Sequence, residues 1–307
     1  MTGTTRLRLM AVHAHPADES GKGAASLAKY AAEGADVLVV TCTGGERGDI
    51  LNPVYPRHRG PVDMGAVRAR EMERARRILG VRHHWLGHAD SGPARHGAPL
   101  PAGCFARADL TAATAGLVRL IRRFRPHVVT THDQEGGHHP HPDHVMAHRV
   151  TAAAFTEAGD RTAHPGTGQP WQPLKLYYGH GSHPARSTAL HLAMRRRGSI
   201  LPRTPLPGEP AHQPHLTTRV PCAEYFPLRD RALLAHASQV DPHGVWFAVP
   251  TSVQQEVWPT DDYTLARSLV PADLPEDDLF AGITATGGTG TAAGLAPLPS
   301  DAAVLAP

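Results

Sequence analysis

The sequence has only three cysteines, Cys42, Cys104 and Cys222, and none of them belongs to a C-x-x-C pair. An odd number of distant cysteines argues against a disulfide framework and against a zinc site built from thiolates. We therefore expect reduced thiols and a cytoplasmic location.

Long apolar runs and an excess of one charge are also missing. No stretch approaches the roughly 18 apolar residues of a membrane span, and no basic segment precedes an apolar one as in a signal peptide. The formal net charge is only +3, and the dense basic runs at 122–125 and 195–197 are not accompanied by a nucleic-acid recognition motif. The sequence predicts a soluble globular protein without a membrane or nucleic-acid partner, and it does not predict the oligomeric state.

Short apolar segments alternate with segments of helical periodicity along the first 180 residues. This alternation predicts an α/β fold in which a mostly parallel sheet is flanked by helices. Beginning with a strand, the expected strands and helices alternate over 7–13, 24–34, 36–42, 67–79, 81–87, 110–124, 127–133, 143–155 and 174–180.

At 307 residues, the chain can bury one large core, or one core and a smaller subdomain. We expect a catalytic core over 1–180 that carries the metal site, and a smaller C-terminal part over 181–282 that completes the substrate site. Within this part, 226–239 shows helical periodicity, whereas the proline-rich 201–213 predicts a loop. Residues 283–307 predict a flexible low-complexity tail.

The chain contains 22 histidines, so only clusters with ligand spacing are informative. His15 and Asp18 lie in a turn directly after the first expected strand. His144 ends a second cluster, 138–144, which follows the fourth expected strand. Because parallel strands end at one edge of a sheet, where open α/β folds bind ligands, we expect the two clusters to meet.

Imidazole and carboxylate groups are ordinary zinc ligands, and a hydrolytic zinc site has three protein ligands and one open position. His15, Asp18 and His144 supply such a two-histidine, one-carboxylate set. A structural zinc site is the alternative, although closed structural sites usually contain cysteines. For each histidine taken singly, a solvated loop position is the alternative.

Two further residues of the second cluster are candidates for catalysis. His141 precedes His144 by three residues at the start of a helix, so the two fall on neighbouring faces of one turn. One imidazole can then bind the metal while that of His141 reaches the substrate. Asp143 lies between them and can orient His141, as carboxylates beside metal sites do.

The segment 43–49 follows the second expected strand, and its glycines allow the backbone to approach a ligand closely. Glu46 or Arg47 is a candidate substrate contact in this segment. An ordinary surface ion pair in a strand-to-helix turn explains the two residues equally well.

The two clusters also carry a resemblance to a known family. Residues 14–19 read A-H-P-A-D-E and residues 141–144 read H-P-D-H. These segments resemble the A-H-P-D-D-E and H-P-D-H motifs of the zinc-dependent de-N-acetylases of the LmbE-like or PIG-L family. Within this family the chain is most similar to the mycothiol S-conjugate amidases. That closer likeness covers about residues 7–282 and rests on the segments 41–49, 171–178, 236–242 and 262–268.

The resemblance implies a Rossmann-like fold and zinc-dependent hydrolysis of an amide. The amidases cleave a mycothiol thioether between its glucosaminyl-inositol part and its acylated cysteine, in detoxification or in natural-product maturation. The implied zinc ligands are His15, Asp18 and His144, and the implied substrate contacts are Lys22, Glu46 and Arg68. His141 is implied to stabilise the oxyanion and to protonate the leaving amine, with Asp143 as its orienting carboxylate.

One departure from the family concerns the general base. Ala17 stands where the family has the aspartate that accepts a proton from water, and a methyl group cannot accept one. Since general-base assistance contributes about 10² to 10⁴-fold to a rate, we expect a site that binds but turns over slowly. A substitution made to trap a ligand, a natural variant that uses another base such as His141, and a protein that has lost hydrolysis all remain open.

A second departure lies in the histidine cluster. Residues 136–144 read G-G-H-H-P-H-P-D-H, one residue longer than the family's G-G-Y-P-H-P-D-H and without its tyrosine, which donates a hydrogen bond to the substrate carbonyl. His139 can replace this tyrosine only if its ring reaches the same point. A plain loop position is the alternative.

Three functions follow for this sequence. The first is a zinc amidase whose partner is a small-molecule thiol conjugate of a glucosaminyl-inositol. The second is a de-N-acetylase of an N-acyl glucosaminyl-inositol or another amino sugar. The third is a catalytically silent binder of thiol conjugates, which Ala17 supports.

Overall fold

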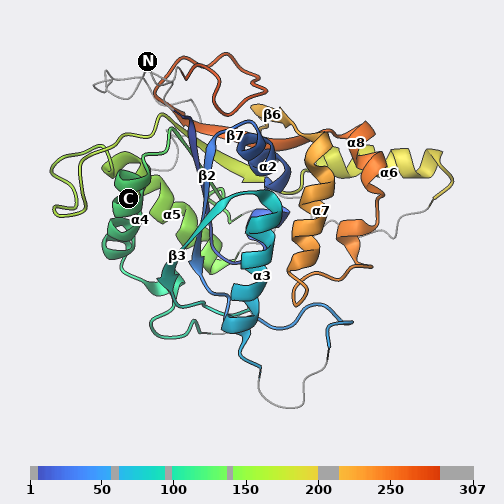
Figure 1. Cartoon of the computed structure of the whole chain (residues 1–307), viewed down its shortest axis with the longest axis horizontal. Coiled ribbons are helices and arrows are strands. Elements are labelled where there is room, and N and C mark those ends of the chain that lie inside the picture. Colours follow the sequence, from blue (N-terminus) through green and yellow to red (C-terminus); the bar gives the residue numbers. More distant parts are fainter. Residues whose placement is uncertain (1–5, 57–61, 94–98, 137–140, 200–213, 284–307) are drawn as a thin grey trace.

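The computed structural model describes residues 6–56, 62–93, 99–136, 141–199 and 214–283. Its centre is a seven-stranded sheet with helices on both faces (Figure 1). The strands lie in the order β3-β2-β1-β4-β5-β7-β6. They are β1 (Arg8–His13), β2 (Asp36–Thr43), β3 (Arg82–His88), β4 (Val128–Thr131), β5 (Lys175–His180), β6 (Thr218–Pro221) and β7 (Thr260–Ser268).

Strands β1 to β5 run parallel to one another, with β1 between β2 and β4. Strand β7 pairs antiparallel with both β5 and β6. The expected α/β fold with a mostly parallel sheet is therefore confirmed.

The longer helices cover the two faces of the sheet. Helices α2, α3 and α7 pack on one face, and α4 and α5 pack on the other (Figure 1). None of the helices within the described ranges is both long enough and apolar enough to cross a bilayer. The helices are α1 (Asp18–Gly21), α2 (Ala24–Ala32), α3 (Met64–Leu79), α4 (Leu110–Phe124), α5 (Pro142–Glu157), α6 (Pro184–Arg196), α7 (Phe226–Ala235) and α8 (Thr251–Val257).

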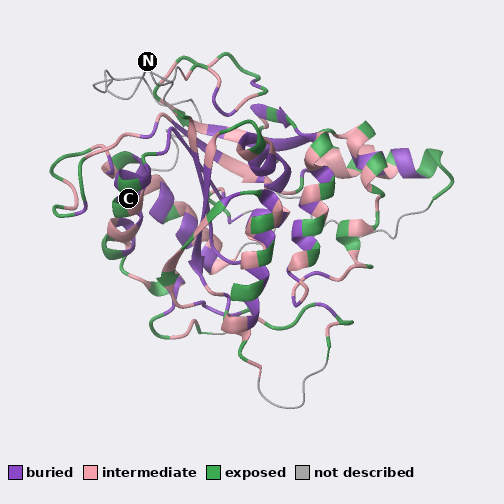
Figure 2. Ribbon diagram, in the orientation of Figure 1, coloured by how far each residue is buried: buried purple, intermediate pink, exposed green. Residues whose placement is uncertain are grey.

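The central strands are buried on both faces. Along β1, Leu9 and Ala11 belong to the core under α2 and α3, whereas Met10 and Val12 belong to the core under α4 and α5. This division follows from the two-residue period of a strand. Figure 2 shows the result, with a buried sheet and helices that are exposed mainly on their outer sides. Continuous apolar runs such as 7–12 are typical of strands in this position.

The expected strands and helices over the first 180 residues are present within a few residues of their expected ends. The helix expected over 226–239 is shorter and ends at Ala235. There the backbone turns so that the N–H and the hydroxyl of Ser238 both donate to the buried carboxylate of Glu71. The sequence analysis did not predict β6, β7, α6 or α8.

The C-terminal part extends the same sheet as the core. Residues Gly179 of β5 and Tyr263 of β7 are paired in the antiparallel ladder, so 181–282 contributes two strands to one continuous sheet. The functional division of the chain at residue 180 stays a prediction. The proline-rich loop over 201–213 and the tail from 284 onward lie outside the described residues.

A buried ion pair joins β5 to the segment that follows β7. The ammonium group of Lys175 contacts the carboxylate of Glu276, and the hydroxyl of Tyr177 donates to the same carboxylate at 2.7 Å. Lys175 is fully buried and Glu276 is 6% exposed. Each charge therefore depends on its partner, because an unpaired charge is costly in such a position.

We predict that Lys175→Met lowers the free energy of unfolding by about 3 to 5 kcal/mol, because it leaves the Glu276 carboxylate buried without its cation. Urea unfolding followed by circular dichroism measures the loss. The exposed pair between Arg197 and Glu256 supplies the control, since Arg197→Met should cost less than about 1 kcal/mol. Equal losses for the two variants would contradict this reading of the buried pair.

Candidate active site

Three side chains from two distant segments converge at the carboxyl ends of β1 and β4. Asp18 Oδ2 lies 3.8 Å from His15 Nδ1 and 3.4 Å from His144 Nε2, and the two imidazole nitrogens are 3.3 Å apart. A tetrahedral zinc ion with bonds near 2.0–2.1 Å separates its ligand atoms by about 3.3 Å. The donor types and their spacing therefore fit a zinc ion.

Local structure explains why these donors meet. Strand β1 ends at His13, and the turn that follows carries His15 and Asp18. The backbone N–H of His15 donates to Asp18 Oδ2 at 2.9 Å and fixes this carboxylate. His144 lies in the first turn of α5, and its Nδ1 contacts the carbonyl oxygen of Gly136 at 2.9 Å. Its Nε2 is thus directed at the other two donors.

The carboxylate of Asp143 orients His15, which corrects the expectation that it orients His141. Asp143 Oδ2 lies 3.2 Å from His15 Nε2, and the carboxylate also accepts the backbone N–H groups of Ser91 and Ala106. The reason is geometric, because the fully buried Asp143 points inward from α5 toward β1. A proton on His15 Nε2 leaves Nδ1 free as a ligand atom.

The electrostatic surroundings favour a cation at this point. Burial lowers the pKa of His15, but the bonds to Asp143 and Asp90 and the charge of Asp18 outweigh burial and raise it to about 9. Burial acts to raise the pKa of Asp18, yet His144 and Lys22 hold it well below its usual range. A metal ion can take the place of the proton that these carboxylates attract.

His141 lies beside the donors and makes two bonds to the backbone. It is the N-cap residue of α5, where its Nδ1 accepts the N–H of Asp143 at 3.2 Å. Its Nε2 lies 3.0 Å from the carbonyl oxygen of Gly92, and its ring centroid is 4.6 Å from that of His15. These contacts assign the proton of a neutral His141 to Nε2.

Two residues that the sequence analysis left without a role also reach the cluster. Asp18, His132 and His144 form one group with ligand spacing, and His15, Asp90 and Asp143 form another. The ring of His132 stacks on that of His144 with centroids 4.3 Å apart. Asp90 and His132 follow β3 and β4 directly, so the rule that ligands gather at strand ends could have indicated both.

The chain resembles known proteins over nearly its whole length. The family model described as PIG-L, GlcNAc-PI de-N-acetylase, matches residues 10–155. The mycothiol S-conjugate amidase of Streptomyces coelicolor is 53% identical over 91% of this chain and 98% of that enzyme. The chain belongs to the PIG-L family.

Other proteins similar to this chain are more distant in sequence. A 1D-myo-inositol 2-acetamido-2-deoxy-alpha-D-glucopyranoside deacetylase of Thermobispora bispora is 39% identical over 90% of this chain and 98% of that enzyme. A conserved protein of Thermus thermophilus shares the fold with a TM-score of 0.58 and 22% identity, over 87% of this chain and 97% of that one.

Three of the expected substrate contacts bind loops of this PIG-L protein instead of pointing freely into solvent. The buried guanidinium of Arg68 donates to the carbonyl oxygens of Gly45 and Pro16 at 3.1 and 2.6 Å. Glu46 Oε1 accepts the backbone N–H of Asp90 at 2.8 Å. Arg47 donates to Asp90 through its backbone and its side chain. An ion pair between Glu46 and Arg47 is not part of this arrangement.

The remaining expected contacts are Lys22 and His139. The ammonium group of Lys22 lies 2.9 Å from Nδ1 of His132. The His132 ring stacks on that of His144, so it lies between Lys22 and this candidate metal ligand. His139 lies outside the described residues. Contact of these two residues, and of Glu46, Arg47 and Arg68, with substrate stays a prediction.

Ala17 has a backbone conformation that suits another residue type. Its φ of 85° lies in the left-handed region, which costs a residue with a Cβ roughly 1–2 kcal/mol and which Asp and Asn adopt more readily. Its N–H donates to Glu19 Oε2 at 3.0 Å, and Glu19 Oε1 lies 2.7 Å from His236 Nε2. The turn is thus anchored to the C-terminal part, and its backbone conformation at position 17 is one that an aspartate adopts more readily than an alanine.

We predict that Asp143→Asn weakens zinc binding by about 10- to 100-fold, because the bond that fixes the tautomer of His15 is lost. Calorimetric titration of the metal-free protein with Zn²⁺ measures the change. Asp109→Asn is the control, since Asp109 is exposed and its N-cap contact to Ala112 survives in an asparagine. Unchanged zinc affinity of Asp143→Asn would show that Asp143 does not position His15.

Proposed function

We propose that the chain is a zinc-dependent amidase that cleaves mycothiol S-conjugates into glucosaminyl-inositol and an acetyl-cysteine S-conjugate. The observation that carries this proposal is the 53% identity to the Streptomyces coelicolor amidase, which extends over 98% of that enzyme. The reaction serves detoxification or natural-product biosynthesis in the cytoplasm.

His15, Asp18 and His144 would hold the zinc ion in this proposal, and the spacing of their three donor atoms supports the assignment. When bound, zinc polarises an amide carbonyl and makes water more acidic. Asp143 keeps His15 in the tautomer that leaves Nδ1 available. Asp90 lies 3.3 Å from the same ring nitrogen and supports this orientation.

His141 supplies a hydrogen-bond donor in the proposed reaction. The Asp143 N–H fixes its Nδ1, so its Nε2 carries the proton that the Gly92 carbonyl accepts in the substrate-free chain. Burial lowers the pKa of His141, and the neighbouring His15 lowers it further, so the substrate-free ring is neutral and offers Nε2–H as a hydrogen-bond donor. We assign to this N–H a hydrogen bond to the oxyanion that forms from the amide carbonyl. As the amide C–N bond breaks, the leaving glucosamine nitrogen takes up the proton that the attacking water gives up.

The step that this chain performs poorly is removal of a proton from the attacking water. Ala17 has no acceptor atom, while its backbone occupies the conformation that an aspartate tolerates. The proposed amidase therefore binds its substrate and turns over slowly. Three explanations of Ala17 were given above: a natural variant with another base, a trapping substitution and a silent binder. They differ in how much a carboxylate introduced at position 17 would change the rate of cleavage.

We predict that Ala17→Asp raises the turnover of a mycothiol S-conjugate by about 10² to 10⁴-fold, because it restores a general base. Release of the primary amine of glucosaminyl-inositol measures the rate. Ala17→Asn is the matched control, since it has nearly the same shape and no proton acceptor of comparable basicity. If Asp and Asn give equal rates while zinc and conjugate still bind, the chain is a silent binder.

De-N-acetylation of an amino sugar is the second candidate function. It is supported by the 39% identity to the Thermobispora bispora deacetylase, which acts on an acetamido sugar joined to inositol. The same metal-ligand atoms and the same N–H donor of His141 would serve this reaction, since both substrates are amides of a glucosamine nitrogen.

We predict that the Ala17→Asp protein cleaves a mycothiol S-conjugate at least about tenfold faster than it cleaves the acetamido sugar of the deacetylase, because additional substrate contacts stabilise the transition state of the larger substrate. Competition between the two substrates at equal concentration, with both products quantified, gives the ratio of kcat/KM. A ratio in favour of the acetamido sugar would assign the chain to the second function.

A further inference from the structure

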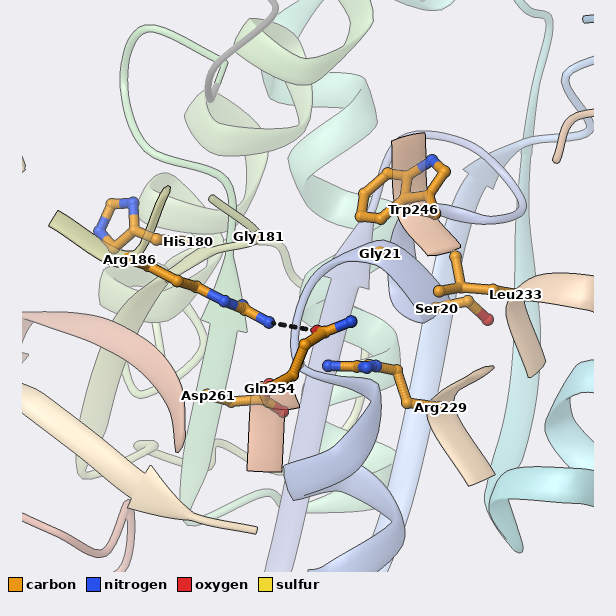
Figure 3. Close-up of a pocket in the computed structure, with 11 residues that line it drawn as sticks. Ser20, Gly21, His180, Gly181, Arg186, Arg229, Leu233, Trp246, Gln254 and Asp261 are labelled. Carbon is orange, nitrogen blue, oxygen red and sulfur yellow. Dashed lines mark hydrogen bonds between the residues drawn. The ribbon is translucent and has the colours of Figure 1, made fainter. Parts of the chain in front are cut away.

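A small cavity lies among the helices of the C-terminal part. It is bordered by α1, the end of β5, α6, α7, α8, β7 and the short helix over Val245–Phe247 (Figure 3). Its volume is about 30 Å³, and it is partly open to solvent. Since a cavity needs roughly 10–15 Å³ to hold a water molecule, this one accommodates water or a single small ion and excludes larger organic groups.

Arg186 of α6 brings unused hydrogen-bond donors to this cavity. A guanidinium carries five N–H donors. That of Arg186 makes a single hydrogen bond within the described part of the chain, from Nη2 to Gln254 Oε1 at 3.3 Å. No carboxylate among the described residues lies within ion-pair distance of it. The positive charge of Arg186 is therefore not directly bound by an acidic side chain of these residues.

Arg229 of α7 brings a second cation to the cavity. It is only 8% exposed, and its Nε and Nη2 donate to Asp230 Oδ1 at 2.9 and 2.8 Å. The other carboxylate oxygen of Asp230 accepts the hydroxyl of Thr251 at 2.5 Å. These bonds leave Nη1 of Arg229 without an acceptor in the described ranges. A buried polar side chain with an unused donor indicates that a water molecule or an ion binds there.

The two guanidinium groups face each other across the cavity. Figure 3 shows both side chains extending from opposite walls toward the side chain of Gln254. Burial lowers the pKa of Arg186, and Arg229 lowers it further, although Asp261 acts in the opposite direction. Because repulsion between like charges strengthens where water is excluded, an anion between the two groups would stabilise this arrangement.

Asp261 is the acidic residue in the described lining of the cavity. Its Oδ2 accepts the backbone N–H of Ser26, in the first turn of α2, at 2.8 Å. Neither Arg186 nor Arg229 lies within ion-pair distance of this carboxylate. Asp261 therefore reduces the positive potential of the cavity without binding either guanidinium group.

We propose that this cavity is a binding site for a chloride ion, which accepts N–H groups of Arg186 and Arg229 and so connects α6 to α7. A monatomic anion suits the small volume, and it accepts hydrogen bonds from several directions without donating any. Phosphate, sulfate and carboxylate ligands are too large. A water molecule would fit, but it carries no charge to offset that of Arg186, and an uncompensated buried charge is costly.

A chloride ion that binds only the folded chain stabilises it by mass action. Urea unfolding of the full chain, followed by circular dichroism, compares sodium chloride with sodium gluconate at equal ionic strength, so that screening is the same. We expect the equilibrium constant for folding to rise about tenfold when chloride reaches about ten times its dissociation constant. Gluconate is too large for the cavity and should give no such rise. Equal constants in the two salts at every concentration would overturn the proposal.

Variants of one helix separate this site from a general effect of the salts. Arg186→Gln removes one cation and should abolish the difference between chloride and gluconate. Arg186→Lys should retain part of the difference, because the positive charge remains. Arg196→Gln, at an exposed position of α6, should behave like the unaltered chain. An undiminished difference in Arg186→Gln would show that chloride acts elsewhere, which would overturn the assignment.

Bromide provides a direct test that does not depend on the stability of any variant. In crystals of the unaltered chain soaked in sodium bromide, we expect an anomalous peak between the guanidinium groups of Arg186 and Arg229, because bromide replaces chloride. Such a peak supports the site. A water molecule at this position, without an anomalous signal, would overturn the proposal even if Arg186→Gln fails to fold.

Discussion

Parallel pairing of β1 with β4 is the constraint on which the site depends. The two strands are neighbours in register, with Ala11 opposite Thr130, so their carboxyl ends deliver two separate loops to one point. The loop after β1 carries His15 and Asp18, and the one after β4 leads to the first turn of α5 with His144. Both strands are buried between two layers of helices. A shift of register by one residue would move the side chains of each face into the core on the opposite side of the sheet, so the register is fixed.

A second layer of buried polar contacts holds the loops in place. Arg68 of α3 bonds the carbonyl oxygens of Pro16 and Gly45, and so joins the loops after β1 and β2. The Glu19 carboxylate binds His236, and both side chains are fully buried. This second contact makes the turn at residues 15–19 depend on the segment after α7. Residues remote in sequence therefore support the metal-ligand geometry as directly as those beside it.

If the chain is the proposed amidase, the arrangement would allow binding without efficient turnover. The donors, the orienting carboxylate of Asp143 and the proton on His141 involve side chains other than that of position 17. In the proposed function, alanine at position 17 lacks the proton acceptor of the resembling family, while the backbone of the turn keeps a left-handed conformation. Binding and proton abstraction thus reside in different atoms, so one can be lost while the other is kept.

The sequence by itself determined the alternation of strands and helices, the family, and the two segments that supply His15, Asp18 and His144. Periodicity and short motifs are local properties of the sequence, so they can be recognised without knowledge of the tertiary structure. Only the tertiary structure decided that the carboxylate of Asp143 contacts His15 and not His141, that Arg68, Glu46 and Arg47 bind neighbouring loops, and that His132 and Asp90 join the cluster. It also decided that β7 returns antiparallel to β5. These contacts join residues far apart in the chain, and their geometry depends on strand order and loop packing, which no local pattern of residues encodes.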